Sequence, residues 1–184
     1  MTMAPRPRKI VLTAHIASSL GWLGAVVVFL ALSVVGLTSQ DVQVVRAAHL
    51  VMEPVAWMVL VPLAFASLLT GLIQALGTPW GLFRHYWVLF KLLITVLVTT
   101  ILLIYMETFG FMAGVAGDPS ADLGGVRNSS PIIHAALALL MLLIATALGV
   151  YKPRGMTQYG QRRQPPHRQA SRRKSPLSEL AQLD

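Results

Sequence analysis

The stretch IVLTAHIASSLGWLGAVVVFLALSVVGL, residues 10–37, decides the fold, because its only ionisable side chain is that of His15. Backbone polar groups in lipid must bond within their own segment, so about 20 apolar residues cross the roughly 30 Å hydrocarbon core as one helix. The stretch is too long for the apolar region of a signal peptide. It therefore predicts an uncleaved transmembrane helix.

Three further uncharged runs follow, of 30, 15 and 24 residues, in a chain that is 55% hydrophobic and only 12% charged. We expect them to form helices over about residues 54–76, 86–107 and 131–151, with a kink at Pro62 and an interfacial helical stretch before the second span. The sequence therefore predicts an all-α integral membrane four-helix bundle, formed by residues 10–151 as one domain.

Basic residues alternate between the segments that flank these helices. Residues 1–9, the short second loop with Arg84, and residues 152–184 are rich in Lys and Arg, whereas the first and third loops carry Asp41, Asp118 and Asp122. Cytoplasmic segments are enriched in Lys and Arg. We expect both ends of the chain in the cytoplasm and a multi-pass protein of the bacterial cytoplasmic (plasma) membrane.

The segment 152–184 holds eight Lys or Arg residues and two acidic residues, among Gln, Pro and Ser. This composition predicts a disordered tail that is attracted to anionic lipid headgroups, at about 1 kcal/mol per basic residue near the surface. Nucleic acid is not expected as a partner, because no Phe, Tyr or Trp lies among the basic residues from Arg162 to Lys174 for base stacking.

His15 and Lys91 form the leading candidate site. At 1.5 Å per residue each lies about 7 Å inside the cytoplasmic border, on the first and third helices. Polar stripes on three helices point to the same depth: Ser18, Ser19 and Trp22; Ser67, Thr70, Gly71 and Gln74; Trp87, Lys91 and Thr95. No carboxylate lies at this depth, so we expect Lys91 to meet an anionic ligand rather than a protein partner. That ligand would be a lipid headgroup or a porphyrin propionate. The alternative is structural, with Lys91 snorkelling to the interface and His15 bonded to a neighbouring helix.

Several motifs resemble a superfamily of small bacterial membrane proteins. They are His15-x6-Trp22-x-Gly24, Pro62 with Gly71, and Trp87-x3-Lys91. The pattern is similar to the HemJ-type protoporphyrinogen oxidases and the copper-resistance D proteins. The run from Gly77 to Trp87 and the ending from Tyr151 to Gly155 resemble a branch of bacterial four-helix proteins without an assigned activity. The resemblance implies haem b as a cofactor and nominates His15 and Lys91 alone, because they match the His and Lys that those proteins use for haem association and activity. Ala25-Val26 stands where those enzymes carry a Pro-Arg pair, which argues against the oxidase activity.

A second candidate site lies near the outer ends of the helices. His49, Met52 and Glu53 are spaced at i, i+3 and i+4, and His134 lies near the start of the fourth span. Imidazole and thioether groups suit copper, and two imidazoles suit axial haem ligation, so His49 and His134 are the candidate metal ligands. The chain has no cysteine, which excludes disulfides and thiolate metal sites.

Three functions remain open at this point, and whether the protein is an enzyme is open as well. The first is haem or porphyrin association through His15 and Lys91. The second is copper or small-solute transport through the outer His and Met residues. The third is a structural subunit, whose small-residue face of Ala17, Gly21 and Gly24 suits close packing against a partner or a second copy of the chain.

Overall fold

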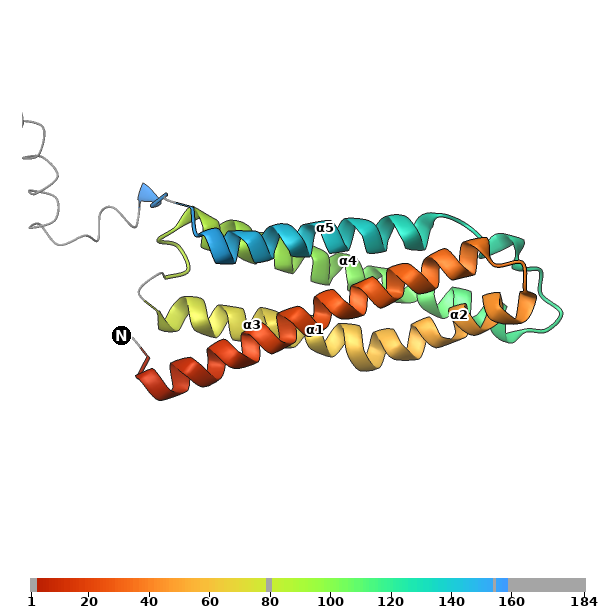
Figure 1. Cartoon of the computed structure of the whole chain (residues 1–184), viewed down its shortest axis with the longest axis horizontal. Coiled ribbons are helices and arrows are strands. Elements are labelled where there is room, and N and C mark those ends of the chain that lie inside the picture. The colour runs from red at the N-terminus through yellow and green to blue at the C-terminus, as the bar shows by residue number, and fades with distance from the viewer. Residues whose placement is uncertain (1–2, 79–80, 154, 159–184) are drawn as a thin grey trace, which may run out of the picture.

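The computed structural model describes residues 3–78, 81–153 and 155–158. Its elements run in the order α1 (Pro5–Thr38), α2 (Val42–Val55), the π-helical turn η1 (Ala56–Leu60), α3 (Val61–Gly77), α4 (Tyr86–Gly117), the 3-10 turn η2 (Leu123–Gly125) and α5 (Ser130–Tyr151). In these residues four helical units are long and apolar enough to cross a membrane, because α2, η1 and α3 form one of them. The expected all-α four-helix membrane bundle is confirmed (Figure 1).

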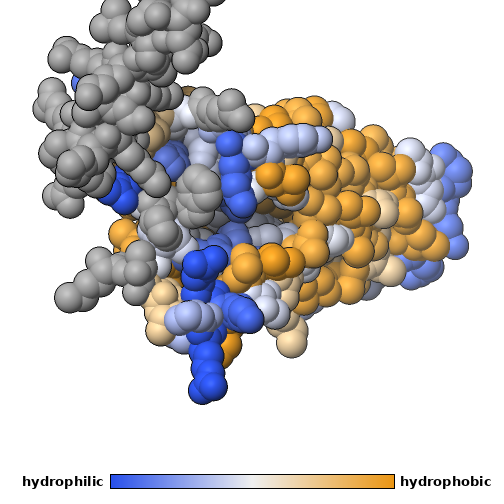
Figure 2. Space-filling model, turned by 60° about the vertical axis from the view of Figure 1, so that its left-hand side comes forward, coloured by the Kyte–Doolittle hydropathy of each residue, from blue (hydrophilic) through white to orange (hydrophobic). Residues whose placement is uncertain are grey.

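The bundle is apolar both inside and outside. Trp22, Phe29 and Phe109 lie in the core, yet Leu93 and Ile104 are 63% and 69% exposed. Figure 2 shows a hydrophobic band between two hydrophilic ends. A helix that is hydrophobic all round belongs in lipid, where exposed apolar side chains cost nothing. The chain is therefore a multi-pass membrane protein.

The second span begins earlier than expected. Helix starts at Val42, where the Asp41 side chain accepts a bond from the Gln43 amide, and it continues through Pro54 instead of beginning there. The π-helical turn at 56–60 follows, and the Val61 amide bonds the Ala56 carbonyl five residues back. Pro62, where we expected a kink, lies directly after this turn at the start of α3, and π-helical turns are a known cause of helix kinks. The expected interfacial stretch is thus part of one continuous helical unit.

The third span is also longer than expected and ends at Gly117 instead of near Glu107. Tyr105 bonds Ser130 at the start of α5, at 3.0 Å between the two hydroxyl oxygens. The later residues of α4 therefore extend beyond α5, by about 18 Å at 1.5 Å per residue. There they pack with α2 and the following loop around a second core of Val45, Met112, Leu123 and Val126. A charged residue on an exposed helix face does not end the helix, which is why the charge pattern misplaced this boundary.

Both ends of the described chain lie at the same end of the bundle, on the left in Figure 1. The Met3 amide bonds the Gly77 carbonyl at 2.9 Å, and the Thr157 amide bonds the Arg84 carbonyl at 3.0 Å. We call this the basic end. The expected disordered tail lies outside the described residues from position 159 onward.

Candidate functional site

His15 lies on α1 near the basic end and faces α3. It is 7% exposed. Its Nδ1 atom lies 3.1 Å from the Ser67 carbonyl oxygen and 3.1 Å from Thr70 Oγ1. A carbonyl oxygen only accepts hydrogen bonds, so Nδ1 carries the proton and donates it. The ring is held in one tautomer, with the lone pair of Nε2 directed away from α3.

Lys91 on α4 meets that lone pair. Its Nζ atom lies 3.1 Å from His15 Nε2, and the lysine is the donor because Nε2 has no proton to give. The polar stripes of α1, α3 and α4 therefore converge inside the bundle. Lys91 points inward to His15 and does not snorkel along the lipid-facing surface. His15 makes the bond to a neighbouring helix that the structural alternative expected. Lys91 does not take the snorkelling position that the same alternative expected.

Hydroxyl groups complete the polar cluster. Ser19 on α1 and Ser67 on α3 bond each other at 2.8 Å between their side-chain oxygens. Thr95 donates to the Lys91 carbonyl, one turn back on α4, at 2.8 Å. Polar groups in an apolar interior are stable only when they are bonded. Each side chain of the cluster therefore has at least one hydrogen-bond partner.

Two glycines permit the close approach of these side chains. A methyl group added at Gly71 on α3 would lie 3.0 Å from His15 Cε1, and one added at Gly149 on α5 would lie 3.3 Å from Lys91 Nζ. Any larger residue displaces the imidazole or the ammonium group. The sequence placed Gly71 in the polar stripe of its helix but gave Gly149 no role. Its signal was a glycine in the fourth span at the depth of His15 and Lys91.

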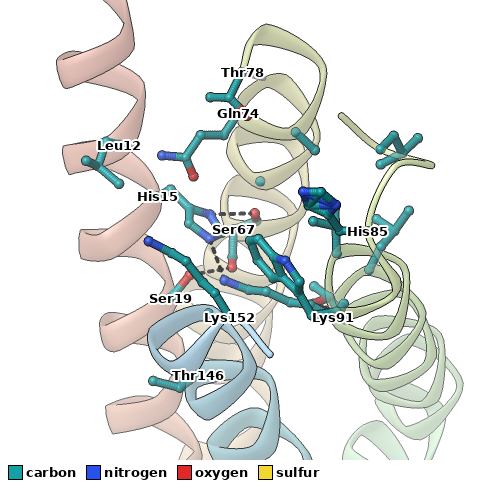
Figure 3. A pocket seen from close by; sticks show the side chains of 18 of the residues that line it. Leu12, His15, Ser19, Ser67, Gln74, Thr78, His85, Lys91, Thr146 and Lys152 are labelled. Carbon is teal, nitrogen blue, oxygen red and sulfur yellow. Dashed lines mark hydrogen bonds between the residues drawn. The ribbon is translucent and has the colours of Figure 1, made fainter. Parts of the chain in front are cut away.

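The pair forms part of the wall of a cleft of about 1040 Å³ at the basic end. Figure 3 shows His15 and Lys91 pointing into it from α1 and α4. The cleft also has an apolar wall, which includes Leu12, Ile16, Leu20 and Val150. Its described lining contains no Asp or Glu, but it contains four cationic residues, namely Arg8, Arg84, Lys91 and Lys152. A cavity with this charge and this shape favours an anionic, amphiphilic ligand.

His85 lies at the mouth of the cleft, directly before α4. Burial lowers the pKa of its imidazole below the ordinary value, and the neighbouring Arg84 guanidinium lowers that pKa further. The cleft therefore owes its positive charge at neutral pH to lysine and arginine. Sequence reasoning missed Arg8, His85 and Lys152 because they lie at helix ends, where basic residues are ordinary.

The candidate metal ligands at the other end have separate surroundings. His49 is 3% exposed, its Nδ1 lies 2.8 Å from the Val45 carbonyl oxygen, and its ring packs against Gly36. His134 is exposed, bonds Ser130 and packs against the Tyr105 ring at 4.3 Å between centroids. Among the described residues no group of three or more His, Cys, Asp or Glu could hold a metal ion. The assignment of His49 and His134 as metal ligands therefore stays a prediction.

No family model, curated protein or solved structure matches the chain. Any functional assignment therefore depends on the chemistry of the cleft itself.

Proposed function

We propose that this membrane protein binds a haem or another porphyrin in the cleft, with His15 as the axial nitrogen donor and Lys91 as the partner of a propionate. The observation that carries the proposal is the 3.1 Å contact between Lys91 Nζ and His15 Nε2. It places an aromatic nitrogen donor and a cation side by side in a membrane cleft without described acidic residues. Its basic end would face the cytoplasm, by the positive-inside rule.

The orientation of His15 fits metal ligation. A metal-bound histidine almost always donates its other ring proton to a carboxylate, a carbonyl or water, which fixes the ring. The Ser67 carbonyl plays that part for His15 Nδ1. The resulting free lone pair on Nε2 is the one that an iron atom needs. A haem held in this way would supply a redox-active iron to the cleft.

The position of Lys91 requires one rearrangement. Its ammonium group occupies the side of His15 Nε2 from which a metal ion would have to approach. Binding of haem iron therefore requires Lys91 to turn from the imidazole, and a propionate at hydrogen-bond distance would compensate for the lost bond. The cleft is at the upper end of the size range typical of small-molecule sites, which is roughly 300–1,000 Å³.

The test is an absorption spectrum of the detergent-purified full-length protein from cells grown with a haem precursor. We expect a Soret band that His15→Ala weakens strongly. Lys91→Gln should retain the band with weaker affinity, because the axial nitrogen remains. His134→Ala is the matched control, since that imidazole is exposed at the opposite end of the bundle, and its spectrum should equal that of the wild type. A colourless wild-type preparation, or a band that His15→Ala leaves intact, would refute the proposal.

A further inference from the structure

The apolar wall of the cleft reaches the outer surface of the bundle. Ile16 and Leu20 on α1 and Val150 on α5 line the cleft, and their exposed fractions are 49%, 58% and 70%. A side chain that lines a cavity and is also exposed at the bundle surface lies at the rim of an opening. This surface faces lipid, because it belongs to the hydrophobic band of the molecule. The cleft therefore has a lateral opening between α1 and α5.

The tilt of α1 explains one side of this opening. Figure 1 shows α1 crossing the bundle obliquely, so that it separates from α5 toward the basic end. There α1 is held on α3 instead. His15 Nδ1 donates to the Ser67 carbonyl of α3, and the Met3 amide, just before α1, donates to the Gly77 carbonyl at the end of α3.

The other side of the opening is fixed by the chain that follows α5. This chain returns to the start of α4, where the Tyr86 amide bonds the Gly155 carbonyl at 3.4 Å and the Thr157 amide bonds the Arg84 carbonyl at 3.0 Å. These bonds hold the end of α5 on α4 while α1 stays on α3. The cleft opens along the seam between the two pairs of helices.

The polarity of the lining follows that of a lipid leaflet. On α1 the lining runs from Arg8, past His15, to Leu20, over about 18 Å at 1.5 Å per residue. It begins with a guanidinium group at the basic end and finishes with an exposed leucine. An anionic amphiphile in this leaflet has the same order, with its charged head at the border and its apolar body deeper in hydrocarbon. Such a ligand can enter sideways without turning over.

We propose that the cleft receives its ligand from the bilayer, through the opening between α1 and α5 in the leaflet at the basic end. This inference rests on the proposed function, because the ligand is the porphyrin that His15 and Lys91 hold. Ile16 and Leu20 form one side of the opening and Val150 forms the other. On this route the porphyrin ring stays out of water while its propionates remain near the charged border. The ligand comes from a reaction that releases its product into the membrane.

The test is the rate at which haem enters the full-length apoprotein in lipid nanodiscs. Haem is dissolved in the nanodisc lipid, and its capture by His15 is followed by stopped-flow measurement of the Soret band. Leu20→Trp and Val150→Trp each place an indole at the opening. Leu93→Trp is the matched control, because that leucine is 63% exposed on α4 and lies outside the described lining of the cleft.

A further variant tests the competing route from water. Thr78 lines the cleft at the end of α3, at the basic end. Thr78→Trp therefore narrows the cleft on its aqueous side and leaves the seam between α1 and α5 unchanged. Entry from the bilayer predicts the wild-type rate for this variant.

We expect Leu20→Trp and Val150→Trp to slow association by about 10-fold or more, because an indole that crowds the opening raises the barrier to passage. Leu93→Trp should associate at the wild-type rate, and Leu20→Ala, which widens the opening, should be no slower than the wild type. A substitution that only loosened bound haem would speed its release and leave association unchanged. The two indoles lie on different helices, so the test remains valid if one variant does not fold.

Association at the wild-type rate in both Leu20→Trp and Val150→Trp would overturn the inference, and so would an equal delay in Leu93→Trp. A delay in Thr78→Trp alone would assign entry to the aqueous side and overturn it as well. In each of these cases a Soret band that His15→Ala weakens would leave the proposed function standing. A wild type that captures no haem would refute both, so the two failures are distinguishable.

Discussion

Replacing Gly71 by alanine tests the geometry of the cluster without removing any of its polar groups. The new methyl group would lie 3.0 Å from His15 Cε1 and 3.4 Å from His15 Nδ1. The matched control is Gly24→Ala on α1, where an added methyl group meets nothing within 4 Å. Both glycines lie inside helices, so the backbone consequences of the two substitutions are the same.

The two contributions at Gly71 are similar in size and opposite in sign. Alanine in a helix interior is about 1 kcal/mol more favourable than glycine. Optimal carbon contacts lie at about 3.5–4.0 Å, so the imidazole must move by roughly half an ångström or more. That movement strains the 3.1 Å bond from His15 Nδ1 to the Ser67 carbonyl, and loss of such a bond costs about 1 kcal/mol. We expect Gly24→Ala to raise the free energy of unfolding by about 1 kcal/mol and Gly71→Ala to leave it nearly unchanged.

The assay is reversible unfolding in mixed detergent micelles, followed by circular dichroism, combined with ¹⁵N NMR of labelled histidine. The NMR spectrum should show His15 protonated at Nδ1 in the wild type and in Gly24→Ala, and a shifted Nδ1 signal in Gly71→Ala. If Gly71→Ala stabilised the protein as much as Gly24→Ala, with an unchanged His15 signal, then the ring does not lie against Gly71 and the derived site geometry is wrong.

Two further predictions concern the opposite end of the bundle. Arg46 donates to the carbonyl groups of Ala116 and Asp118, at the end of α4, at 3.0 and 2.6 Å. Arg46→Ala should therefore lower the free energy of unfolding by about 2–3 kcal/mol. An unchanged denaturation midpoint would show that these bonds do not stabilise the end of α4. The side-chain and backbone bonds from Ser120 hold the pKa of the Asp118 carboxyl below its usual value. A carboxyl group whose pKa is lower in the folded state stabilises the fold at pH values above its unfolded-state pKa. This stabilisation is lost as the pH falls through the folded-state pKa. Wild type should therefore exceed Asp118→Asn in stability at pH 6, and the gap should close below about pH 4; a gap of the same size at pH 3 would contradict this prediction.

The number of spans could be predicted because lipid imposes a simple length requirement. An uncharged run that matches the bilayer thickness has few alternatives to a helix. The helix ends opposite the basic end could not be predicted in the same way. Met112 and Val126 pack in a second core beyond the start of α5, and the charge pattern records where a helix leaves lipid, not where it stops. Pro54 misled for a related reason, since a proline is typical of the first turn of a helix but here lies inside α2.

Counting residues from the membrane border gave the depth of His15 and Lys91 but not their contact. Two residues at one depth on different helices lie anywhere around a bundle, and a contact at 3.1 Å also requires the right helix neighbours. Here α3 approaches α1 closely enough for Gly71 to touch the imidazole. That neighbourhood depends on the order and tilt of the helices, which periodicity along one chain does not encode.

The sequence also gave no sign that Lys152 lines the cleft, although it suggested His15 and Lys91. A lysine after the last apolar residue of a span is the ordinary way for a transmembrane helix to end. Only the left-handed backbone of Lys152, at φ 43°, separates it from that ordinary case. A strained residue persists when the surrounding structure holds it there, and the bonds of Tyr86 and Thr157 do so. Replacing Lys152 with glycine should therefore keep or increase the free energy of unfolding, because glycine adopts this left-handed backbone without steric cost.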